Sequence, residues 1–320
     1  MVHDDSWAGR RSYLEKETAM DVSDLVVFEA VSRHGSMNRA ASELNTVQSN
    51  VTARIRALED DLGVSLFQRH ARGVSITPSG QRIQPLVARL TKLLADVRTA
   101  ARDDGAPHGM LHLGSLETTT ALRLSAPLTQ FAQIHPEVRL IITTGTTRKL
   151  LDDVINCRLE GAFVAGPVAH PDLHQEKVFT EELVLVTSRH ISRPDELKDI
   201  ADLKTIVFQA GCSYRQRLDS LLFAMGAVTA RPLEFGSLEA IISCVSAGIG
   251  ITLLPKGIVG PAWQEGRIAV HELPHDEGHV DTLFVRRHDA FVSSAMTAFL
   301  ELARSRTSGS SHASLQTAVT

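Results

Sequence analysis

The sequence has only three cysteines among its 320 residues, and it has no long apolar run. Cys157, Cys212 and Cys244 are scattered without CxxC spacing, which excludes a disulfide scaffold and the usual structural zinc site. No apolar run approaches the roughly 18 residues needed to cross a bilayer. Charges throughout the N-terminal stretch also speak against a secretory signal. We therefore expect free thiols, a cytoplasmic protein and no membrane partner.

Positive charge is lacking as well. The 33 Lys and Arg residues are outnumbered by 37 Asp and Glu residues, so the formal net charge is −4. Phosphate attraction depends on local distribution rather than on the sum, but even residues 20–80 are not basic in total. A nucleic-acid site in this chain would have to depend on architecture and dimerisation more than on charge.

Catalytic signatures are also missing. The sequence has no nucleophile elbow, phosphate loop or dinucleotide fingerprint, so we expect neither an enzyme nor a cofactor. His271, His275 and His279 recur at every fourth residue, which on a helix would suit a metal. Pro274 and Gly278 interrupt that pattern, and we expect a solvated loop between two strands and no metal site.

Residues 36–77 carry the clearest positive signal. Apolar positions at helical spacing lie on either side of Asn45-Thr46, which predicts two short helices joined by a tight turn. Two extended runs around Arg72-Gly73 predict a hairpin wing beside them. Small polar side chains in the first turns of the second helix suit base edges in a major groove, and nearby arginines suit phosphates. The predicted DNA-binding residues are Ser36, Gln48, Ser49, Asn50, Thr52, Arg54, Arg56, Arg69, Arg72 and Thr77. The alternative is a solvated helical hairpin without a ligand.

A second helical segment is predicted from Thr77-Pro78, an N-cap followed by proline, to about Arg102. Pro85 should kink this helix or be accommodated in its early turns. Its apolar residues recur at three-and-four spacing: Ile83, Leu86, Val87, Leu90, Leu93, Leu94, Val97 and Ala101. Such a stripe favours pairing with the same helix of a second subunit, and the alternative is packing on its own domain.

Beyond a Gly- and Pro-containing break at residues 103–109, strands alternate with helices, which predicts open α/β sheets. Ligands bind at the carboxyl ends of the strands of such sheets. Small and hydroxyl residues gather at these ends, although single residues of this kind are often only helix caps. The predicted effector-binding residues are Ser115, Glu117, Thr118, Thr119, Thr144, Gly145, Thr146, Gly166, Pro167, Cys212, Ser213, Arg215 and Ser237.

Three of these residues allow alternatives. Glu117 either favours the N-terminus of the following helix or faces an amino group of the effector, and Arg215 would then pair with a carboxylate of the same molecule. Cys212 precedes a helix whose dipole can lower a thiol pKa, which leaves a redox-sensing role open.

The N-terminal region that includes residues 36–77 also resembles a known family. The residues that carry this resemblance are Leu25, Phe28, Val31, Gly35-Ser36, Ala40-Ala41, Leu44, Gln48-Ser49, Val51, Ile55, Leu58-Glu59, Leu62-Gly63, Leu66-Phe67, Arg69 and Thr77-Pro78-Ser79-Gly80. Together these residues resemble the N-terminal domain of LysR-type transcriptional regulators, and the similarity extends loosely from Asp21 to about Ala303. It implies a winged helix-turn-helix, a long dimerising linker helix and a two-lobed α/β effector-binding domain like type 2 periplasmic binding proteins.

The domain boundaries expected from the resemblance are a disordered extension over 1–19, a DNA-binding domain over 20–80, a linker helix over 77–106 and an effector-binding domain over 109–304. Lobe I would comprise 109–182 and 286–304, lobe II 183–285, and 305–320 a disordered tail. The partners implied are double-stranded DNA, a small-molecule effector, a second copy in a homodimer or homotetramer, and RNA polymerase. A solute-binding protein or a small-molecule enzyme is the alternative function.

Overall fold

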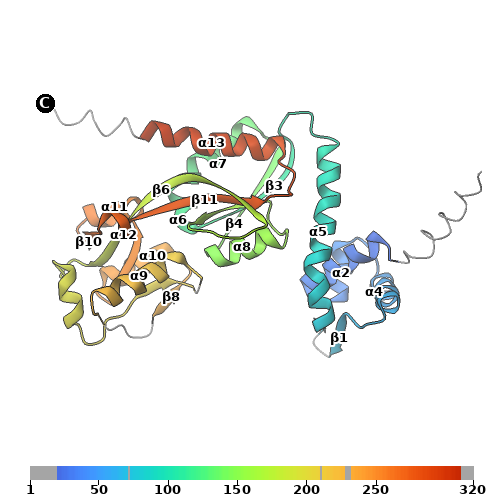
Figure 1. Ribbon diagram of the computed structural model, residues 1–320, viewed down its shortest axis with the longest axis horizontal. Coiled ribbons are helices and arrows are strands. Elements are labelled where there is room, and N and C mark those ends of the chain that lie inside the picture. Colours follow the sequence, from blue (N-terminus) through green and yellow to red (C-terminus); the bar gives the residue numbers. More distant parts are fainter. Residues whose placement is uncertain (1–19, 71–72, 210, 228–231, 311–320) are drawn as a thin grey trace, which may run out of the picture. The chain divides into compact units, whose positions relative to one another are not determined.

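The structure is a computed structural model that describes residues 20–70, 73–209, 211–227 and 232–310. The chain forms two compact units, which divide between Arg98 and Thr99. The expected extension over 1–19, Arg72, and positions 311–320 of the expected tail lie outside the described residues. Figure 1 shows the elements of each unit.

The first unit begins with three helices, α2 (Val22–His34), α3 (Met37–Glu43) and α4 (Gln48–Leu62). Asp21 and Ser36 cap the N-termini of α2 and α3, accepting hydrogen bonds from the amides of Ser23 and Arg39. The helices bury one shared apolar core, which includes Phe28, Ala40, Val51, Ile55, Leu58 and Leu66. The helix-turn-helix predicted from hydrophobic spacing is therefore confirmed.

The wing is an antiparallel hairpin of β1 (Phe67–His70) and β2 (Gly73–Ile76). Glu59 of α4 connects it to the helices, because its carboxylate accepts hydrogen bonds from the amides of Leu66 at 2.7 Å and Phe67 at 3.1 Å. Gly73 has a φ of 134°, and a Cβ there would lie 2.7 Å from the carbonyl oxygen of Gly35. Only glycine allows the hairpin to approach the end of α2 this closely.

The long helix α5 (Pro78–Ala100) begins where the sequence predicted. The Thr77 hydroxyl accepts a hydrogen bond from the Gly80 amide at 3.1 Å, so Thr77 is the expected N-cap. Pro85 is the eighth residue of the helix, and the helix continues through it to Ala100. Ile83 and Val87 pack on the core of the first unit, whereas Leu86, Leu90, Leu93 and Val97 are exposed.

The second unit contains a seven-stranded mixed sheet, whose long central strands β6 (Leu173–Ser188) and β11 (His279–Arg287) run antiparallel through two lobes (Figure 1). A register shift next to Thr282 marks a bulge in this pair. In lobe I the sheet continues through β5 (Gly161–Ala165), β3 (Gly109–Ser115) and β4 (Val138–Thr144). These three strands are parallel, so their carboxyl ends lie at one edge.

Helices cover both faces of the lobe I sheet. A continuous helical segment consists of α6 (Glu117–Thr119), a π-helical turn over Thr120–Leu124 and α7 (Ser125–Ile134). It packs with α13 (Ser294–Ser310) over Phe131, Phe163 and Phe299. On the other face α8 (Thr147–Ile155) contributes Leu150 and Val154 to a core that continues into lobe II.

In lobe II, β9 (Thr252–Pro255) and β10 (Ile268–Glu272) flank the end of β6, and β7 (Ile206–Phe208) pairs in parallel with β8 (Leu233–Phe235). Helix α9 (Ser213–Ala224) covers one face, and α10 (Leu238–Ser246) and α11 (Lys256–Gln264) the other. The strands and helices alternate as predicted, and the two-lobed α/β architecture is confirmed.

Four details differ from the predictions. The sequence did not predict α11 or the 3₁₀ helix over Pro194–Asp199. The loop expected near the histidines contains one helical turn, α12 (His275–Gly278), and α13 continues past Ser305, the expected start of the tail, to Ser310. Within the described part of the chain, no helix is both long and apolar enough to cross a membrane.

Candidate functional site

Helix α4 presents a polar face at its first turns. Val51, Ile55 and Leu58 are buried against α2 and α3, which leaves Gln48, Ser49 and Asn50 exposed. The N-cap, Val47, makes no side-chain hydrogen bond, so nothing on that residue covers the first amides of the helix. The Asn50 amide group donates to the Thr46 hydroxyl at 3.0 Å and keeps its carbonyl oxygen for another donor.

Besides Asn50, three of the predicted DNA-binding residues make contacts inside the first unit. The Arg54 guanidinium donates to the Ser23 hydroxyl at 2.5 Å and to the Asp24 carboxylate at 2.8 Å. Thr77 donates its hydroxyl to the Ser65 carbonyl oxygen, and Ser36 caps α3. These contacts have structural roles, and DNA contact by the same residues remains a prediction.

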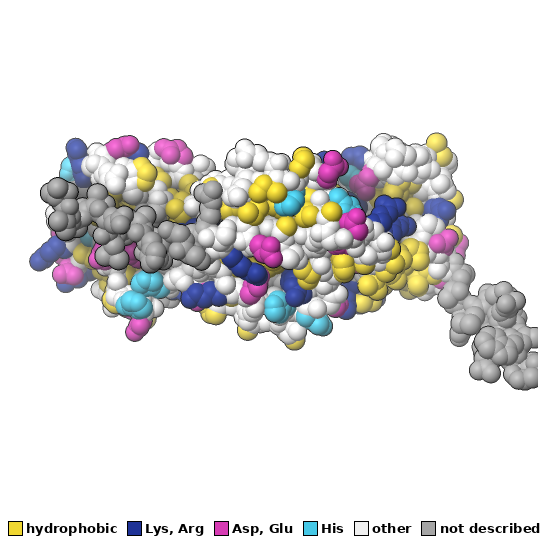
Figure 2. Space-filling view, turned by 90° about the horizontal axis from the view of Figure 1, so that it is seen from above, with side chains coloured by type: hydrophobic (Ala, Val, Ile, Leu, Met, Phe, Trp, Pro, Cys, Tyr) yellow, Lys and Arg dark blue, Asp and Glu magenta, His cyan; other side chains and the backbone are white. Residues whose placement is uncertain are grey.

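The other predicted DNA-binding residues are accessible to different degrees. Arg56 on α4 and Arg69 on β1 are exposed, and Thr52 is half-buried. Arg72 lies outside the described residues. On the face of the molecule in Figure 2, basic and acidic side chains are interspersed rather than gathered by sign. This agrees with the sequence, in which charge alone does not identify a nucleic-acid site.

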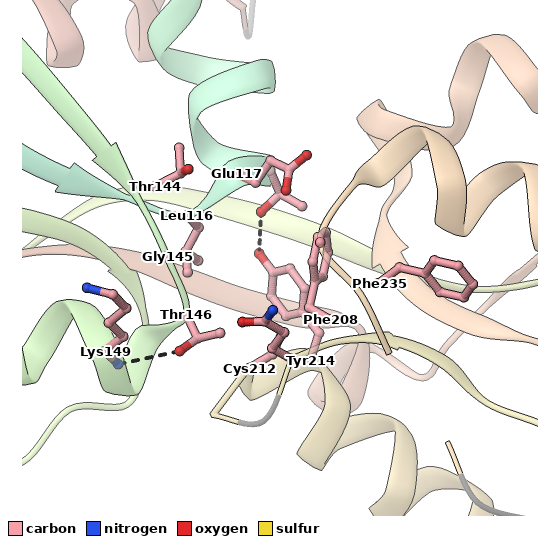
Figure 3. Close-up of a pocket in the computed structure, with 13 residues that line it drawn as sticks. Leu116, Glu117, Thr144, Gly145, Thr146, Lys149, Phe208, Cys212, Tyr214 and Phe235 are labelled. Carbon is pink, nitrogen blue, oxygen red and sulfur yellow. Dashed lines mark hydrogen bonds between the residues drawn. The ribbon is translucent and has the colours of Figure 1, made fainter. Parts of the chain in front are cut away.

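A cavity of about 290 Å³ lies between the two lobes, at the carboxyl ends of β3, β4, β7 and β8 (Figure 3). Lobe I contributes the turn after β3 and the residues before α8. Lobe II contributes aromatic side chains and the start of α9. The cavity is lined by Leu116, Glu117, Thr118, Thr144, Gly145, Thr146, Lys149, Phe208, Gln209, Cys212, Tyr214, Phe235 and Gly236.

Hydrogen bonds connect the lobes at this cavity, and one of them joins the Arg148 amide of lobe I to the Gly211 carbonyl oxygen of lobe II at 3.4 Å. Glu117 Oε1 of lobe I accepts from the Leu238 amide, the first residue of α10 in lobe II, at 3.2 Å. The hydroxyls of Thr118 and Tyr214 lie 3.4 Å apart, the pair joined by a dashed line in Figure 3. Burial raises the pKa of Tyr214 to about 12, so its hydroxyl stays protonated and available for hydrogen bonding.

The structure brings together six of the predicted effector-binding residues in this cavity: Glu117, Thr118, Thr144, Gly145, Thr146 and Cys212. Gly166, Pro167 and Ser213 line a second cavity between the lobes, together with Thr147, the first residue of α8. Ser115, Thr119, Arg215 and Ser237 do not line the first cavity. The Ser115 hydroxyl is fully buried and donates to the Leu116 carbonyl oxygen, so it cannot reach a ligand there.

Sequence reasoning missed the hydrophobic part of the cavity wall. Phe208 and Phe235 are the last residues of β7 and β8, and Tyr214 lies in the first turn of α9. The location of Phe208 and Phe235 at strand ends could have identified them, because the neighbouring polar residues were predicted to bind a ligand from the same location. Lys149 was also missed, and its ammonium is bound to the Asp153 carboxylate at 2.5 Å.

The predicted pairing of Arg215 with an effector carboxylate is not supported by its contacts. The Arg215 guanidinium is bound to the Glu234 carboxylate at 2.6 Å, and it does not line the first cavity. The acidic partner on β8 holds it within lobe II. Glu117 and Arg215 therefore do not line the same cavity in this structure.

The expectation for Cys212 is also corrected. Its side chain is buried at the N-cap of α9, and this burial raises the pKa of the thiol. The nearby amides of Arg215 and Tyr214 and the charge of Arg215 lower it only in part. Desolvation outweighs the helix dipole, and a reactive thiolate is disfavoured. None of the three cysteines forms a disulfide bond.

The histidines of the β10–β11 connection do not form a metal cluster. His271 is buried and lies 2.9 Å from the Thr187 hydroxyl, whereas the rings of His275 and His279 contact each other. Among the described residues, no group of three or more His, Cys, Asp or Glu side chains is placed to hold a metal ion.

Comparison with known families now identifies the chain. Residues 22–81 match the model of the bacterial regulatory helix-turn-helix protein, lysR family, and residues 104–308 match the LysR substrate binding domain. The chain belongs to the LysR family. This LysR-type protein is a DNA-binding transcriptional regulator with an effector-binding domain. The alternatives of a solute-binding protein and an enzyme are thereby set aside.

Relatives and solved structures agree. The chain is 42% identical over 281 residues to the HTH-type transcriptional regulator GltR of Bacillus subtilis, covering 88% of this chain and 95% of that protein. It is 35% identical over 288 residues to CzcR of Bacillus thuringiensis, with 90% and 95% covered. Full-length OxyR C199D from Pseudomonas aeruginosa shares the fold at a TM-score of 0.68 and 20% identity, with 89% and 98% covered. Full-length CbnR complexed with its target DNA shares it at 0.59 and 21%, with 89% and 99% covered.

Proposed function

We propose that this LysR-type regulator reads operator DNA with the first turns of α4 and holds the backbone with the wing. Gln48, Ser49, Asn50, Thr52 and Arg54 are the proposed base-reading residues. Ser36, Arg56, Arg69, Arg72 and Thr77 are proposed to contact the sugar-phosphate backbone. The solved complex of CbnR with its target DNA supports this, because that protein shares the fold.

The observation that carries this proposal is the asymmetry of α4. Val51, Ile55 and Leu58 are buried in the core of the first unit, while Gln48, Ser49 and Asn50 are exposed at the N-terminal end of the helix. Side chains in this position on a recognition helix reach base edges in the major groove, and small ones permit close approach.

The proposed assembly is a homodimer formed through α5, with a homotetramer as the complete regulator. The exposed residues Leu86, Leu90, Leu93 and Val97 support it, since their spacing alternates between four and three residues. This is the spacing of a coiled-coil seam. RNA polymerase is the proposed downstream partner, and the cytoplasm the proposed location.

The proposed effector site is the first cavity between the lobes. Because residues of both lobes line it, a bound molecule changes the balance between lobe arrangements when it fits one of them better. We propose that this population shift changes the spacing of the paired α4 helices on DNA. We propose that residues 20–80 form the DNA-binding domain, residues 77–106 the linker helix and residues 109–304 the effector-binding domain.

A gel-shift experiment tests the proposal. The full-length protein is incubated with genomic fragments and with random DNA of equal length over a series of salt concentrations. We expect some fragments to be bound selectively and the affinity to fall with salt, because phosphate contacts release counterions. Binding that is equal on all DNA, or absent, would contradict operator recognition.

A further inference from the structure

Among the described residues that line the first cavity, Glu117 is the one charged side chain without an ion-pair partner. Lys149, which lines the same cavity, is bound to Asp153. Glu117 accepts one hydrogen bond, from the Leu238 amide to Oε1. Among the described residues, no Lys, Arg or His lies within ion-pair distance of it, and no donor contacts its Oε2. An ionised carboxylate has acceptor positions for about four donors, so most of this group's capacity is unused.

The surroundings of Glu117 make an unpaired carboxylate energetically unfavourable at this position. It is half-buried at the start of α6, and the rings of Phe208 and Tyr214 line the same cavity (Figure 3). Charged groups taken from water into apolar surroundings are normally paired. A cation placed here gains the carboxylate and also the negative faces of aromatic rings.

Glu117 also occupies a position that favours anions. The Leu238 amide belongs to the first residue of α10, and the side chain of Ser237, the N-cap of that helix, makes no capping hydrogen bond. Helix N-termini attract negative charge. Because the Glu117 carboxylate already takes this place, an anionic effector would meet a like charge there.

We propose that the effector of this regulator carries a protonated amine, held by Glu117, on a compact apolar body that contacts Phe208 and Tyr214. This inference rests on the proposed function, since it names the chemical class of ligand for the proposed effector cavity. Thr144 and Thr146 of lobe I also line the cavity, and their hydroxyls suit a second, hydrogen-bonding group of the ligand. The cavity volume of about 290 Å³ suits one small molecule.

The test uses three probes of nearly equal shape that differ in charge: benzylamine, benzyl alcohol and benzoate. Calorimetry on the full-length protein, in phosphate buffer rather than an amine buffer, measures each affinity. We expect benzylamine to bind about tenfold more tightly than benzyl alcohol, because its contact with Glu117 is charge-assisted. Benzoate is expected to bind most weakly of the three.

Two variants locate the effect. Glu117→Gln keeps an acceptor for the Leu238 amide but removes the charge, and should abolish the preference for benzylamine. Glu239→Gln is the matched control. It removes an exposed carboxylate from the first turn of the same α10, outside the cavity, and should leave the preference intact.

Two results would overturn the proposal: benzoate binding more tightly than benzylamine, or Glu117→Gln binding benzylamine as tightly as the parent protein. Failure of all three probes to bind would also count against an amine-bearing effector with an apolar body. A gel-shift with the same preparations separates this outcome from failure of the proposed function. Selective DNA binding by a protein that binds no amine would reject only the effector class.

Discussion

The guanidinium of Arg54, in the proposed DNA-reading helix α4, donates to the carboxylate of Asp24 in α2 at 2.8 Å. The Asp24 side chain is 12% exposed and that of Arg54 37%. This ion pair between partly buried groups fixes α4 against α2. It involves Arg54, which the sequence predicted to contact a DNA base. The structure raises a second role for Arg54, as a residue that positions α4.

The first prediction concerns this ion pair. Arg54→Ala and Asp24→Ala should each destabilise the first unit, and the coupling between them should be about 1 kcal/mol, because Arg54 is partly open to solvent. Urea unfolding of the parent, the two single variants and the double variant measures this value. If the losses in unfolding free energy of the two single variants simply add in the double variant, the contact contributes nothing to stability.

The second prediction separates base contact from phosphate contact. Asn50→Ala should cost about 1–3 kcal/mol on the selected operator and little on random DNA, whereas Arg69→Ala should weaken binding to both. Arg72→Ala is expected to behave like Arg69→Ala. Gel-shifts on operator and random DNA over a salt series provide the measurement, and the arginine variants should also show a smaller salt dependence. If Asn50→Ala loses equal affinity for both DNAs, Asn50 does not contact a base.

The elements of the fold were predictable because they depend on local patterns. The spacing of Ala40, Val51, Ile55 and Leu58 predicts the helix-turn-helix directly, and these residues form its core. The lobes were predictable as alternating strands and helices. Helix α11 was missed because Gly257, Gly260 and Pro261 interrupt its pattern, although Val259 and Ala262 are buried.

The candidate site was predictable only in part. Residues 115–119 and 144–146 follow parallel strands, so their meeting at one edge follows from sheet geometry. The bond between Glu117 and Leu238 joins residues 121 positions apart and depends on how the lobes close. Within lobe II, Arg215 binds Glu234 of β8, which lies 19 positions away in the sequence. The sequence shows that such residues are charged, but it does not show which residue each of them contacts.

The third prediction follows from the raised pKa of the Cys212 thiol. A raised pKa means that the reactive thiolate forms only at higher pH than in an ordinary cysteine. In the native protein, iodoacetamide should therefore modify Cys212 more slowly than the half-buried Cys157 and Cys244, and its rate should rise at more alkaline pH. Mass spectrometry of timed samples over a pH series measures the three rates. The urea-unfolded protein is the control, in which the differences should disappear, and fast native labelling of Cys212 at neutral pH would contradict the prediction.

The last prediction concerns the exposed stripe of α5. Ile83 and Val87 already pack on the first unit, while Leu93, which is 60% exposed, lies on a different face with Leu86, Leu90 and Val97. Leu93→Glu places a charge at the centre of the proposed seam and should cost about 2 kcal/mol, or roughly thirtyfold in the dissociation constant of the dimer. Sedimentation of the full-length protein over a concentration series measures that constant. Ala95→Glu is the matched control, because two further residues along an α-helix point to nearly the opposite side, and it should leave the dimer intact. An unchanged dimer in Leu93→Glu, or an equal loss in both variants, would mean that the subunits do not pair through this face.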